Sequence, residues 1–345
     1  MKRLNLNTLF ATTILTSVLV CSCSNDDDNN SDKDYSASTA LYASNNSDGN
    51  ITIYDVTDAA NISTKTLITS SAMADGIYYD ATSDAVIQAS RSELGLEGFS
   101  NISSLLTNAA VSVDISGTND MSSPREVAVN NNIYVVADNA DVDGDATTPD
   151  GKLYIYTKSG NSFTLRNTII TDFKLWGITF NGNDLYAVVD ATNELAVFNN
   201  FTANTSDATL SASKRIAFEG ITRTHGLTYD TASDIMIMTD IADAANGQDD
   251  GAFHIIEDFT SKFNDTENGA TLAVTQQTRV AGDATLLGNP VDVAYDSETE
   301  TIFIAEAGNG GGRILAFNNI GSGGNISPVV NNSLAAASSV FLSKK

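Results

Sequence analysis

His225-Gly226-Leu227-Thr228-Tyr229-Asp230 is one copy of a six-residue pattern that recurs along this chain of 345 residues. The copies share an alternation of apolar and polar residues and close on Asp, Asn or Ser, as a short β-strand entering a turn does. They begin at residues 75, 125, 176, 225, 291 and 338, so neighbouring copies lie 47 to 66 residues apart. Recurrence at a period of this size indicates a solenoid, a propeller or another array of repeated units.

The segments between the copies predict three more short strands in each period. They are rich in Val, Ile, Tyr, Phe and Thr and are bounded by Asn, Asp and Gly. In two neighbouring periods these strands are expected at Leu185–Val189, Glu194–Phe198 and Ser211–Ala217, and at Ile235–Thr239, Ala252–Glu257 and Ala270–Thr278. No sustained apolar stripe of helical period follows the N-terminal segment. Four strands per unit of about 40–50 residues are typical of a β-propeller blade.

Counting the units predicts six blades. Five full units start at residues 75, 125, 176, 225 and 291, residues 40–70 supply three strands without a first, and Ser338–Leu342 is a first strand without the rest. The two incomplete pieces together make a sixth blade, which removes the open sheet edges. The sequence therefore predicts an all-β fold over residues 40–345: a six-bladed β-propeller of four-stranded antiparallel blades, closed by the C-terminal strand joining the N-terminal blade.

The repeated units resemble the NHL/YVTN class of six-bladed β-propellers, a broad class that includes the SMP-30/gluconolactonase-like enzymes. The resemblance rests on the Gly-apolar-x-Tyr/Phe-Asp/Asn first strands and on the turn Asp190-Ala191-Thr192-Asn193-Glu194-Leu195. That turn is similar to the Asp-x-x-Asn-x-x-apolar turn of NHL repeats. The resemblance spans roughly residues 40–345 and concerns architecture, which does not by itself specify a function.

The N-terminus predicts export with a lipid anchor. Lys2 and Arg3 precede an apolar segment that ends at Val20 and is shorter than a transmembrane helix. The following Cys21-Ser22-Cys23 resembles a bacterial lipobox, so residues 1–22 are expected to be a signal peptide and Cys23 to carry the lipid, such as palmitate. Cys21 is the alternative lipidated residue, and an ordinary secretory signal is the other interpretation.

Residues 23–39 are rich in Ser, Asn and Asp, a composition typical of a disordered tether. Their Cys-Ser-acidic start resembles the signal of surface-exposed Bacteroidetes outer-membrane lipoproteins. No cysteine follows residue 23, so the exported chain has no internal disulfide. The formal net charge of −25 disfavours nucleic acids and anionic membrane surfaces as partners, which leaves the lipid as the expected membrane contact.

First strands line the channel of a propeller, so the residues that open them are candidates for a ligand site. The predicted ligand-binding side chains are Asp75, Arg125, Trp176 and His225, with Glu126 and Asp292 one position further along. Val291 and Ser338 occupy the two remaining opening positions. The alternative interpretation of Trp176 and His225 is that each packs or hydrogen-bonds within the fold.

Acidic residues predict a cation site, and Ca²⁺, which seeks six to eight oxygen ligands, is the expected ion. One predicted set lies at the ends of the second strands: Asp138, Asp190, Asp240 and Glu306, with Ser90 and Asn45 in the other two blades. The other is the alternating set Asp141, Asp143 and Asp145 in a long loop. The alternative interpretation is that these carboxylates accept backbone N–H bonds in turns.

The sequence lacks a Gly-x-Ser-x-Gly elbow, a phosphate-binding glycine loop and a His-Glu-x-x-His pattern. The expected function is a ligand-binding or interaction module for a small polar molecule, a glycan or a protein. The resemblance implies an alternative, a metal-dependent lactonase or esterase, in which a channel metal bound by Glu, Asn and Asp activates water. Whether the chain is an enzyme stays open, as does a third possibility, in which outer loops only present a partner surface.

Overall fold

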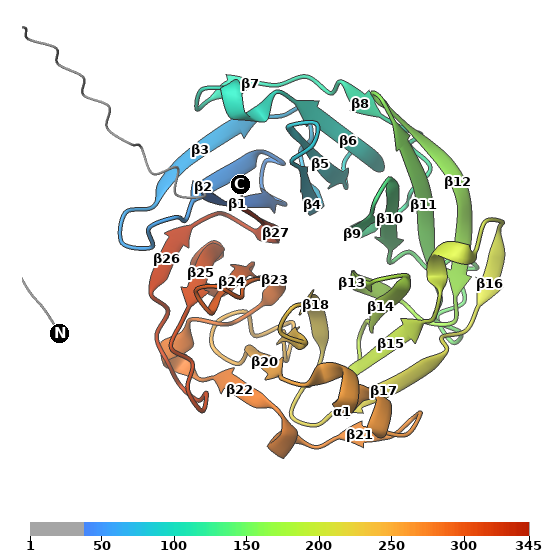
Figure 1. Cartoon of the computed structure of the whole chain (residues 1–345), viewed down its shortest axis with the longest axis vertical. Coiled ribbons are helices and arrows are strands. Elements are labelled where there is room, and N and C mark those ends of the chain that lie inside the picture. The colour runs from blue at the N-terminus through green and yellow to red at the C-terminus, as the bar shows by residue number, and fades with distance from the viewer. Residues whose placement is uncertain (1–37, 345) are drawn as a thin grey trace, which may run out of the picture. The chain divides into compact units, whose positions relative to one another are not determined.

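The computed structural model describes residues 38–344, which form a ring of six blades with their first strands around the centre (Figure 1). The predicted signal peptide, the lipidation site and the predicted tether up to residue 37 lie outside the described residues. The prediction of an all-β, six-bladed propeller is confirmed.

Each blade is a meander of four antiparallel strands that runs outward from the centre of the ring. Blade 1 consists of β27 (Ala337–Lys344), β1 (Thr39–Asn45), β2 (Ile51–Asp55) and β3 (Ser63–Ile68). Blade 2 consists of β4 (Ala74–Asp80), β5 (Ala85–Ser90), β6 (Gly95–Ser100) and β8 (Ile115–Ser116). Blade 3 consists of β9 (Pro124–Asn130), β10 (Ile133–Asp138), β11 (Gly151–Ser159) and β12 (Ser162–Thr171).

The other three blades repeat this order. Blade 4 consists of β13 (Leu175–Asn181), β14 (Asp184–Val189), β15 (Glu194–Phe198) and β17 (Lys214–Phe218). Blade 5 consists of β18 (Thr224–Asp230), β19 (Ile235–Asp240), β20 (Ala252–Ile256) and β22 (Thr278–Ala281). Blade 6 consists of β23 (Pro290–Asp296), β24 (Thr301–Glu306), β25 (Arg313–Phe317) and β26 (Val330–Ser333).

Short parallel contacts join the outer edges of neighbouring blades. Three additional strands each pair with the outer strand of the preceding blade: β7 (Ala109–Ala110) with β3, β16 (Ala208–Leu210) with β12, and β21 (Thr271–Leu272) with β17. A further parallel contact pairs Ser116 of β8 with Ser162 of β12. Five 3₁₀ turns complete the described elements: η1 (Ile102–Ser104), η2 (Phe201–Ala203), η3 (Val274–Gln276), η4 (Asp283–Thr285) and η5 (Asn309–Gly311).

The ring is closed by the C-terminal strand, as expected. Strand β27 pairs antiparallel with β1 from Thr39 opposite Lys344 to Asn45 opposite Ala337. Side chains reinforce the junction, because the Ser44 and Ser338 hydroxyls lie 3.0 Å apart and Ser44 donates to the Asp75 carbonyl of the next blade. Blade 1 is therefore built from both ends of the described chain, and no described blade has an unpaired first strand.

The hydrophobic core lies between blades. The apolar alternation of each strand puts one row of side chains on each face of the sheet, and both faces meet a neighbouring blade. Each of the six blade interfaces accordingly holds one buried cluster. Leu227 and Tyr229 of the opening motif pack in the cluster between blades 4 and 5. This packing explains why the repeated pattern is apolar although its strands surround a channel.

Blade 5 departs from the expected strand pattern. The prediction of a fourth strand at Ala270–Thr278 is largely wrong, since that segment first adds β21 to blade 4 and only then enters β22. Before it lies α1 (Phe259–Asp265), in which the four-residue spacing places Phe259 and Phe263 on one buried face. Both rings contact Tyr186, with centroids 5.3 and 5.4 Å away. This insertion accounts for much of the long 225–291 interval.

Among residues 38–344, no helix is long and apolar enough to cross a bilayer.

Candidate ligand site in the central channel

Four residues that open consecutive inner strands form a continuous row at one end of the channel. Nη1 of Arg125 lies 3.1 Å from Oδ2 of Asp75, and Cζ of Arg125 lies 4.2 Å from the Trp176 ring centroid. The Trp176 ring stacks on His225, with ring centroids 3.7 Å apart and planes only 6° from parallel. The structure thus brings together Asp75, Arg125, Trp176 and His225, in the order in which their blades follow one another.

Charged groups extend this row at both ends. At one end, Asp75 also faces Nε of Arg91 at 3.5 Å and accepts a hydrogen bond from Asn46. Burial raises the pKa of the Asp75 carboxyl, and the guanidinium groups of Arg125 and Arg91 oppose that rise. We call the seven residues that form this chain of contacts the rim row: Arg91, Asp75, Arg125, Trp176, His225, Asp190 and Arg223.

At the other end of the rim row, Asp190 accepts hydrogen bonds from Arg223 at 2.8 and 3.0 Å and from Asn139 at 2.9 Å. Burial raises the pKa of the Asp190 carboxyl, but the contacts with His225, Asn139 and Arg223 outweigh it and hold that pKa well below its usual range. The carboxylates of the rim row are therefore neutralised by guanidinium groups of the same row.

His225 is buried and neutral at physiological pH. Burial lowers its pKa to about 4, although Asp190 opposes that shift. Its Nε2 lies 3.3 Å from Oδ1 of Asp190 but is not aligned for a hydrogen bond, and Nδ1 also lacks a hydrogen-bond partner in the described part of the chain. Nε of Arg125 is a third buried atom of the rim row without a hydrogen-bond partner there. The stacked rings, rather than hydrogen bonds, hold the imidazole in place.

One residue further along their inner strands, Glu126, Asp292 and Ser339 form a layer that we call the channel floor. The Ser339 hydroxyl lies 2.7 Å from Oδ2 of Asp292 and 3.4 Å from Oε2 of Glu126. Backbone N–H groups complete the layer, since Val127 donates to Glu126 and Val340 donates to Asp292. The three side chains come from blades 3, 6 and 1.

Glycine occupies the floor position of the other three blades. A Cβ atom on Gly226 would lie 2.4 Å from the Asp292 Cα, and one on Gly177 would lie 2.4 Å from the His225 carbonyl oxygen. Both distances are too short for any side chain, so glycine is required where these inner strands approach one another. As a result, only two carboxyl groups and one hydroxyl project from this layer of the channel.

The two floor carboxyl groups are poorly neutralised. Burial raises the pKa of Glu126 well above its usual range, and the negative charge of Asp292 raises it further. Burial likewise raises the pKa of Asp292 to about 7. Neither group forms an ion pair within residues 38–344. Burial and mutual repulsion both disfavour a state in which the two carboxyl groups are ionised together. The pair therefore tends to retain a proton near neutral pH.

Beyond the floor, the channel is hollow. A cavity of about 240 Å³ extends from Glu126 and Asp292 along the inner strands, away from the rim row. Its accessible lining is polar in the larger part, because each first strand pairs on one side only and turns its other edge toward the channel, and its far part carries aromatic rings. The residues along it include Ile77, Val127, Ile178, Leu227, Val293, Val340, Tyr78, Phe180, Tyr295 and Phe341. Glu126 borders this hollow and keeps partial solvent exposure, although protein atoms surround it. The channel is thus a pocket with an acidic end.

Within residues 38–344, the acidic residues at the ends of the second strands do not come together as one group. Asp138 accepts backbone N–H bonds from Ser122 and Ser123, and Asp240 accepts them from Thr222 and Arg223. Glu306 accepts four such bonds, from residues 288, 289, 308 and 309. Ser90 and Asn45 accept backbone N–H bonds in the same way. These side chains fix the loops of their own blades, as the alternative interpretation expected, whereas Asp190 joins the rim row.

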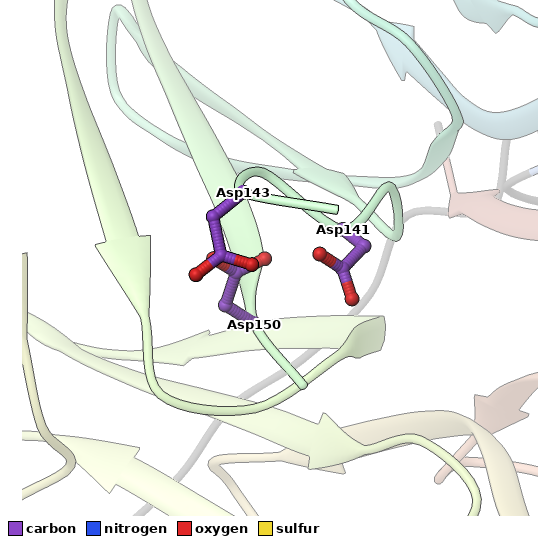
Figure 2. A group of neighbouring side chains, drawn as sticks. All are labelled: Asp141, Asp143 and Asp150. Atoms are coloured by element: carbon purple, nitrogen blue, oxygen red, sulfur yellow. The ribbon is translucent and has the colours of Figure 1, made fainter. Parts of the chain in front are cut away.

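The long loop between β10 and β11 does gather carboxylates. Asp141, Asp143 and Asp150 each place an oxygen within 4.8 Å of the others. Figure 2 shows the three side chains lying close together in the loop. They are the one such group of at least three among residues 38–344, and they are half-buried or exposed. The expected third member, Asp145, lies outside the group and accepts hydrogen bonds from Thr147. Three carboxylates supply part of a Ca²⁺ shell, so calcium binding in this loop stays a prediction.

The rim row follows from the repeat register, whereas the importance of the floor could not be derived in that way. Glu126 and Asp292 were grouped with the rim residues because each stands next to one in sequence. The structure instead separates them into their own layer and adds Ser339, which sequence reasoning did not select. One signal was present: the floor position is glycine in three copies of the motif and acidic in two.

Comparison with known proteins places the fold but not the function. No family model and no curated protein matches this chain. A chain of a nidogen/laminin complex has a TM-score of 0.55 at 12% identity, covering 88% of this chain and 98% of that one.

Two Bacteroides structures are also similar in fold. A protein of unknown function from Bacteroides caccae gives a TM-score of 0.53 at 9% identity, covering 88% of this chain and 98% of that chain. A putative 6-phosphogluconolactonase from Bacteroides fragilis gives 0.52 at 10% identity, covering 86% and 82%. At such identities the likeness concerns the fold alone, and it supports the assignment of this chain to the β-propellers.

Proposed function

We propose that this chain is a ligand-binding β-propeller that takes a small molecule into its central channel, with the ligand's polar group on the channel floor. The observation that carries the proposal is the hollow of about 240 Å³, which ends at Glu126 and Asp292. Ligand sites are concave and hold a small number of convergent polar groups, and this hollow is concave with two carboxyl groups at one end. Its volume lies below the range of about 300–1,000 Å³ for drug-sized ligands, so the ligand is small.

The rim row supports this proposal because its paired charges would block one end of the channel and leave the other end for entry of the ligand. Its charges pair with one another, so a ligand approaching from that side would have to break the ion pairs of Asp75 and Asp190. Entry from the opposite end requires no such break, because no residue that lines the hollow belongs to an ion pair among residues 38–344. The ligand site proposed from the sequence therefore moves from the rim residues to the floor and the cavity beyond it.

The alternative, a metal-dependent hydrolase, gains no support from the geometry. Such an enzyme needs at least three ligands around a metal, with an open position for water. Within the described residues, no three His, Cys, Asp or Glu side chains converge in the channel, and the acidic group at Asp141 belongs to an outer loop. We therefore favour binding without catalysis.

Filling the cavity tests the proposed function. Thr179 and Thr228 line the channel, and Thr179→Phe combined with Thr228→Phe would occupy the hollow without touching the floor residues. Calorimetric titration with 2-phenylethanol and 2-phenylethylamine should show saturable binding to the wild type and none to the filled variant. The matched control is Thr164→Phe on the exposed side of β12, which should bind as the wild type does. Unchanged binding in the filled variant would place any site elsewhere.

We further propose that the propeller is displayed on the cell envelope as a lipoprotein anchored through Cys23. The supporting features are the basic start, the short apolar segment and the Cys-Ser-acidic junction in the sequence. Metabolic labelling with a palmitate analogue tests this: Cys23→Ser should abolish the label, while Cys21→Ser should retain it. Label that persists in Cys23→Ser and disappears in Cys21→Ser would move the anchor to Cys21. Protease treatment of whole cells would show whether the propeller faces outward.

A further inference from the structure

We propose that the channel binds an organic ammonium ion, with its charged nitrogen on Glu126, Asp292 and Ser339 and its apolar body in the hollow beyond. The proposal rests on the proposed function, since it names the class of ligand for the same cavity. Four features carry it: the negative charge of the floor, the number of its acceptors, the chemistry of the lining and the size of the hollow.

The floor has no positively charged partner from the protein among residues 38–344. In the rim row, one position away, Asp75 and Asp190 each face guanidinium groups within 3.5 Å. Glu126 and Asp292 have no such partner among residues 38–344, and the nearby charge of Asp75 adds to their repulsion. The hydroxyl hydrogen of Ser339 can be donated to only one of the two carboxyl groups at a time. A buried carboxylate pair in this state favours a positive charge delivered from the cavity.

The geometry of the acceptors suits an ammonium group. A primary ammonium carries three N–H donors and no acceptor. The floor offers three oxygen-bearing side chains around one point, because the Ser339 hydroxyl lies within 3.4 Å of both carboxyl groups. Charge-assisted hydrogen bonds of this kind are about twice as strong as neutral ones, and more so away from water.

The floor disfavours a bare metal ion. Ca²⁺ takes six to eight oxygen ligands, and Mg²⁺ keeps several waters around a strict octahedron. The floor supplies only three oxygen-bearing side chains, Glu126, Asp292 and Ser339. Half-buried aromatic side chains such as Tyr78, Tyr295 and Phe341 line the hollow beyond this acidic end, which matches a molecule with one charged nitrogen and a hydrocarbon body.

Aromatic rings at the far part of the cavity add a second element of recognition. Tyr78 and Phe341 pack edge to face, with ring centroids 4.8 Å apart, and both line the cavity together with Tyr295. Ring faces attract cations and pack well against other rings, so this segment both favours entry of an ammonium ion and holds an aryl or alkyl body. An amine with a single aromatic ring is the simplest probe, because its nitrogen can bind the channel floor while its ring packs against the aromatic side chains.

The test compares 2-phenylethylamine, which is protonated near neutral pH, with its neutral analogue 2-phenylethanol, by calorimetry at constant sodium chloride. The wild type should bind the amine at least about tenfold more tightly than the alcohol, as expected for hydrogen bonds to charged groups. In Glu126→Gln with Asp292→Asn, this ratio should fall close to one while the alcohol still binds. Asp230→Asn, at the end of β18 and outside the cavity lining, is the matched control and should keep the wild-type ratio.

Two results would overturn the ammonium assignment while leaving the proposed function intact. Equal affinities of the wild type for amine and alcohol would show that the pocket does not favour a positive charge. An unchanged amine-to-alcohol affinity ratio in Glu126→Gln with Asp292→Asn would show that the floor carboxyl groups do not select the charged ligand. Binding of neither probe would remove both proposals. A calcium chloride titration tests whether the floor binds a metal ion instead. If the wild type binds Ca²⁺ but not the amine, and the double variant does not bind Ca²⁺, the floor is a metal site.

Folding of the variant is controlled within the same experiment, since retained binding of 2-phenylethanol shows an intact cavity. Ser339→Ala provides a second variant that leaves both carboxyl groups in place. Removing its hydroxyl takes away one acceptor, so the amine-to-alcohol ratio should fall to a value between those of the wild type and the double variant. A ratio in Ser339→Ala as high as the wild type's would contradict the three-acceptor geometry.

Discussion

The rim row and the channel floor are neighbouring layers of the channel, one residue apart at Arg125 and Glu126 of β9, yet the charges in the two layers are balanced differently. In the rim row every carboxylate faces a guanidinium group within 3.5 Å, and the aromatic pair Trp176 and His225 continues the row. In the floor, two carboxyl groups share one serine hydroxyl and border a hollow. The difference shows that position in the channel decides how a buried carboxyl group is balanced: guanidinium groups neutralise those of the rim row, whereas those of the floor have no such partner among residues 38–344.

Removing a carboxylate from the rim row should produce the largest loss of stability. Asp75→Ala leaves Arg125, whose side chain is only 11% exposed, without its partner. Breaking a buried pair by removing one member costs about 3–5 kcal/mol of unfolding free energy. Urea unfolding measures this, with Asp55→Ala on an exposed site of β2 as the control that should change little. A loss under about 1 kcal/mol would mean that the rim charges are not interdependent.

The same kind of change in the floor should act in the opposite direction. Asp292 has a pKa of about 7 in the folded chain, raised by burial from an ordinary value of 3.8. The folded state therefore binds the proton more tightly than the unfolded state, and loses stability as pH rises from about 4 to about 7. Asp292→Asn should remove this deficit and stabilise the protein at pH 8 by up to about 4 kcal/mol.

Urea unfolding of wild type and Asp292→Asn at pH 5 and pH 8 measures that effect. The gain should be smaller at pH 5, because the wild-type floor is then largely protonated. The groups that face Asp292 are Glu126 from β9, Ser339 from β27 and Asp75 from β4, and none of them brings a positive charge. A variant that is less stable than the wild type at pH 8 would show that the floor is neutralised after all.

His225 gives the rim row a pH dependence of the other sign. Burial lowers its pKa to about 4, against 6.5 in an unfolded chain. The unfolded state therefore takes up the proton first, so stability present at neutral pH is lost as pH falls from about 6.5 to about 4, by up to about 3 kcal/mol.

His225→Gln should remove this contribution, and urea unfolding between pH 7 and pH 4.5 measures it. His254 serves as an internal reference, because burial lowers its pKa to about 4 as well. The variant should therefore retain roughly half of the histidine-linked pH dependence. No change in that dependence would mean that Asp190 keeps His225 protonated in the folded protein.

Trp176→Leu should give the smallest of these effects. The substitution keeps an apolar side chain but removes a ring that contacts Arg125 at 4.2 Å and stacks on His225 at 3.7 Å. Cation–π and ring-stacking contacts are each worth about 0.5–1.5 kcal/mol, so a loss of about 1–2 kcal/mol is expected in urea unfolding. A loss below about 0.5 kcal/mol would show that the ion pairs alone hold the rim row.

The sequence predicted the ring well because each blade repeats the same local pattern. It failed where the chain inserts a different one, as at α1, whose two buried phenylalanines are too few to stand out as a helical stripe. The rim row was predictable in part, since equivalent positions of consecutive strands must lie side by side. The floor was not, because Glu126 and Asp292 come from blades that are not neighbours in the ring. Their meeting depends on the channel width, which Gly177 and Gly226 set through contacts that no single strand displays.

The closure of blade 1 by β27 makes the channel floor depend on a late step of folding. Strand β1 finds its partner only in the last residues of the chain, with Thr39 opposite Lys344. That contact has nearly the greatest sequence separation the chain allows, and such contacts form late. Because β27 also supplies Ser339, the channel floor is complete only once β27 has paired with β1. A variant truncated before residue 337 would therefore lack Ser339 and leave one edge of β1 unpaired, so that ring closure and assembly of the channel floor are a single event.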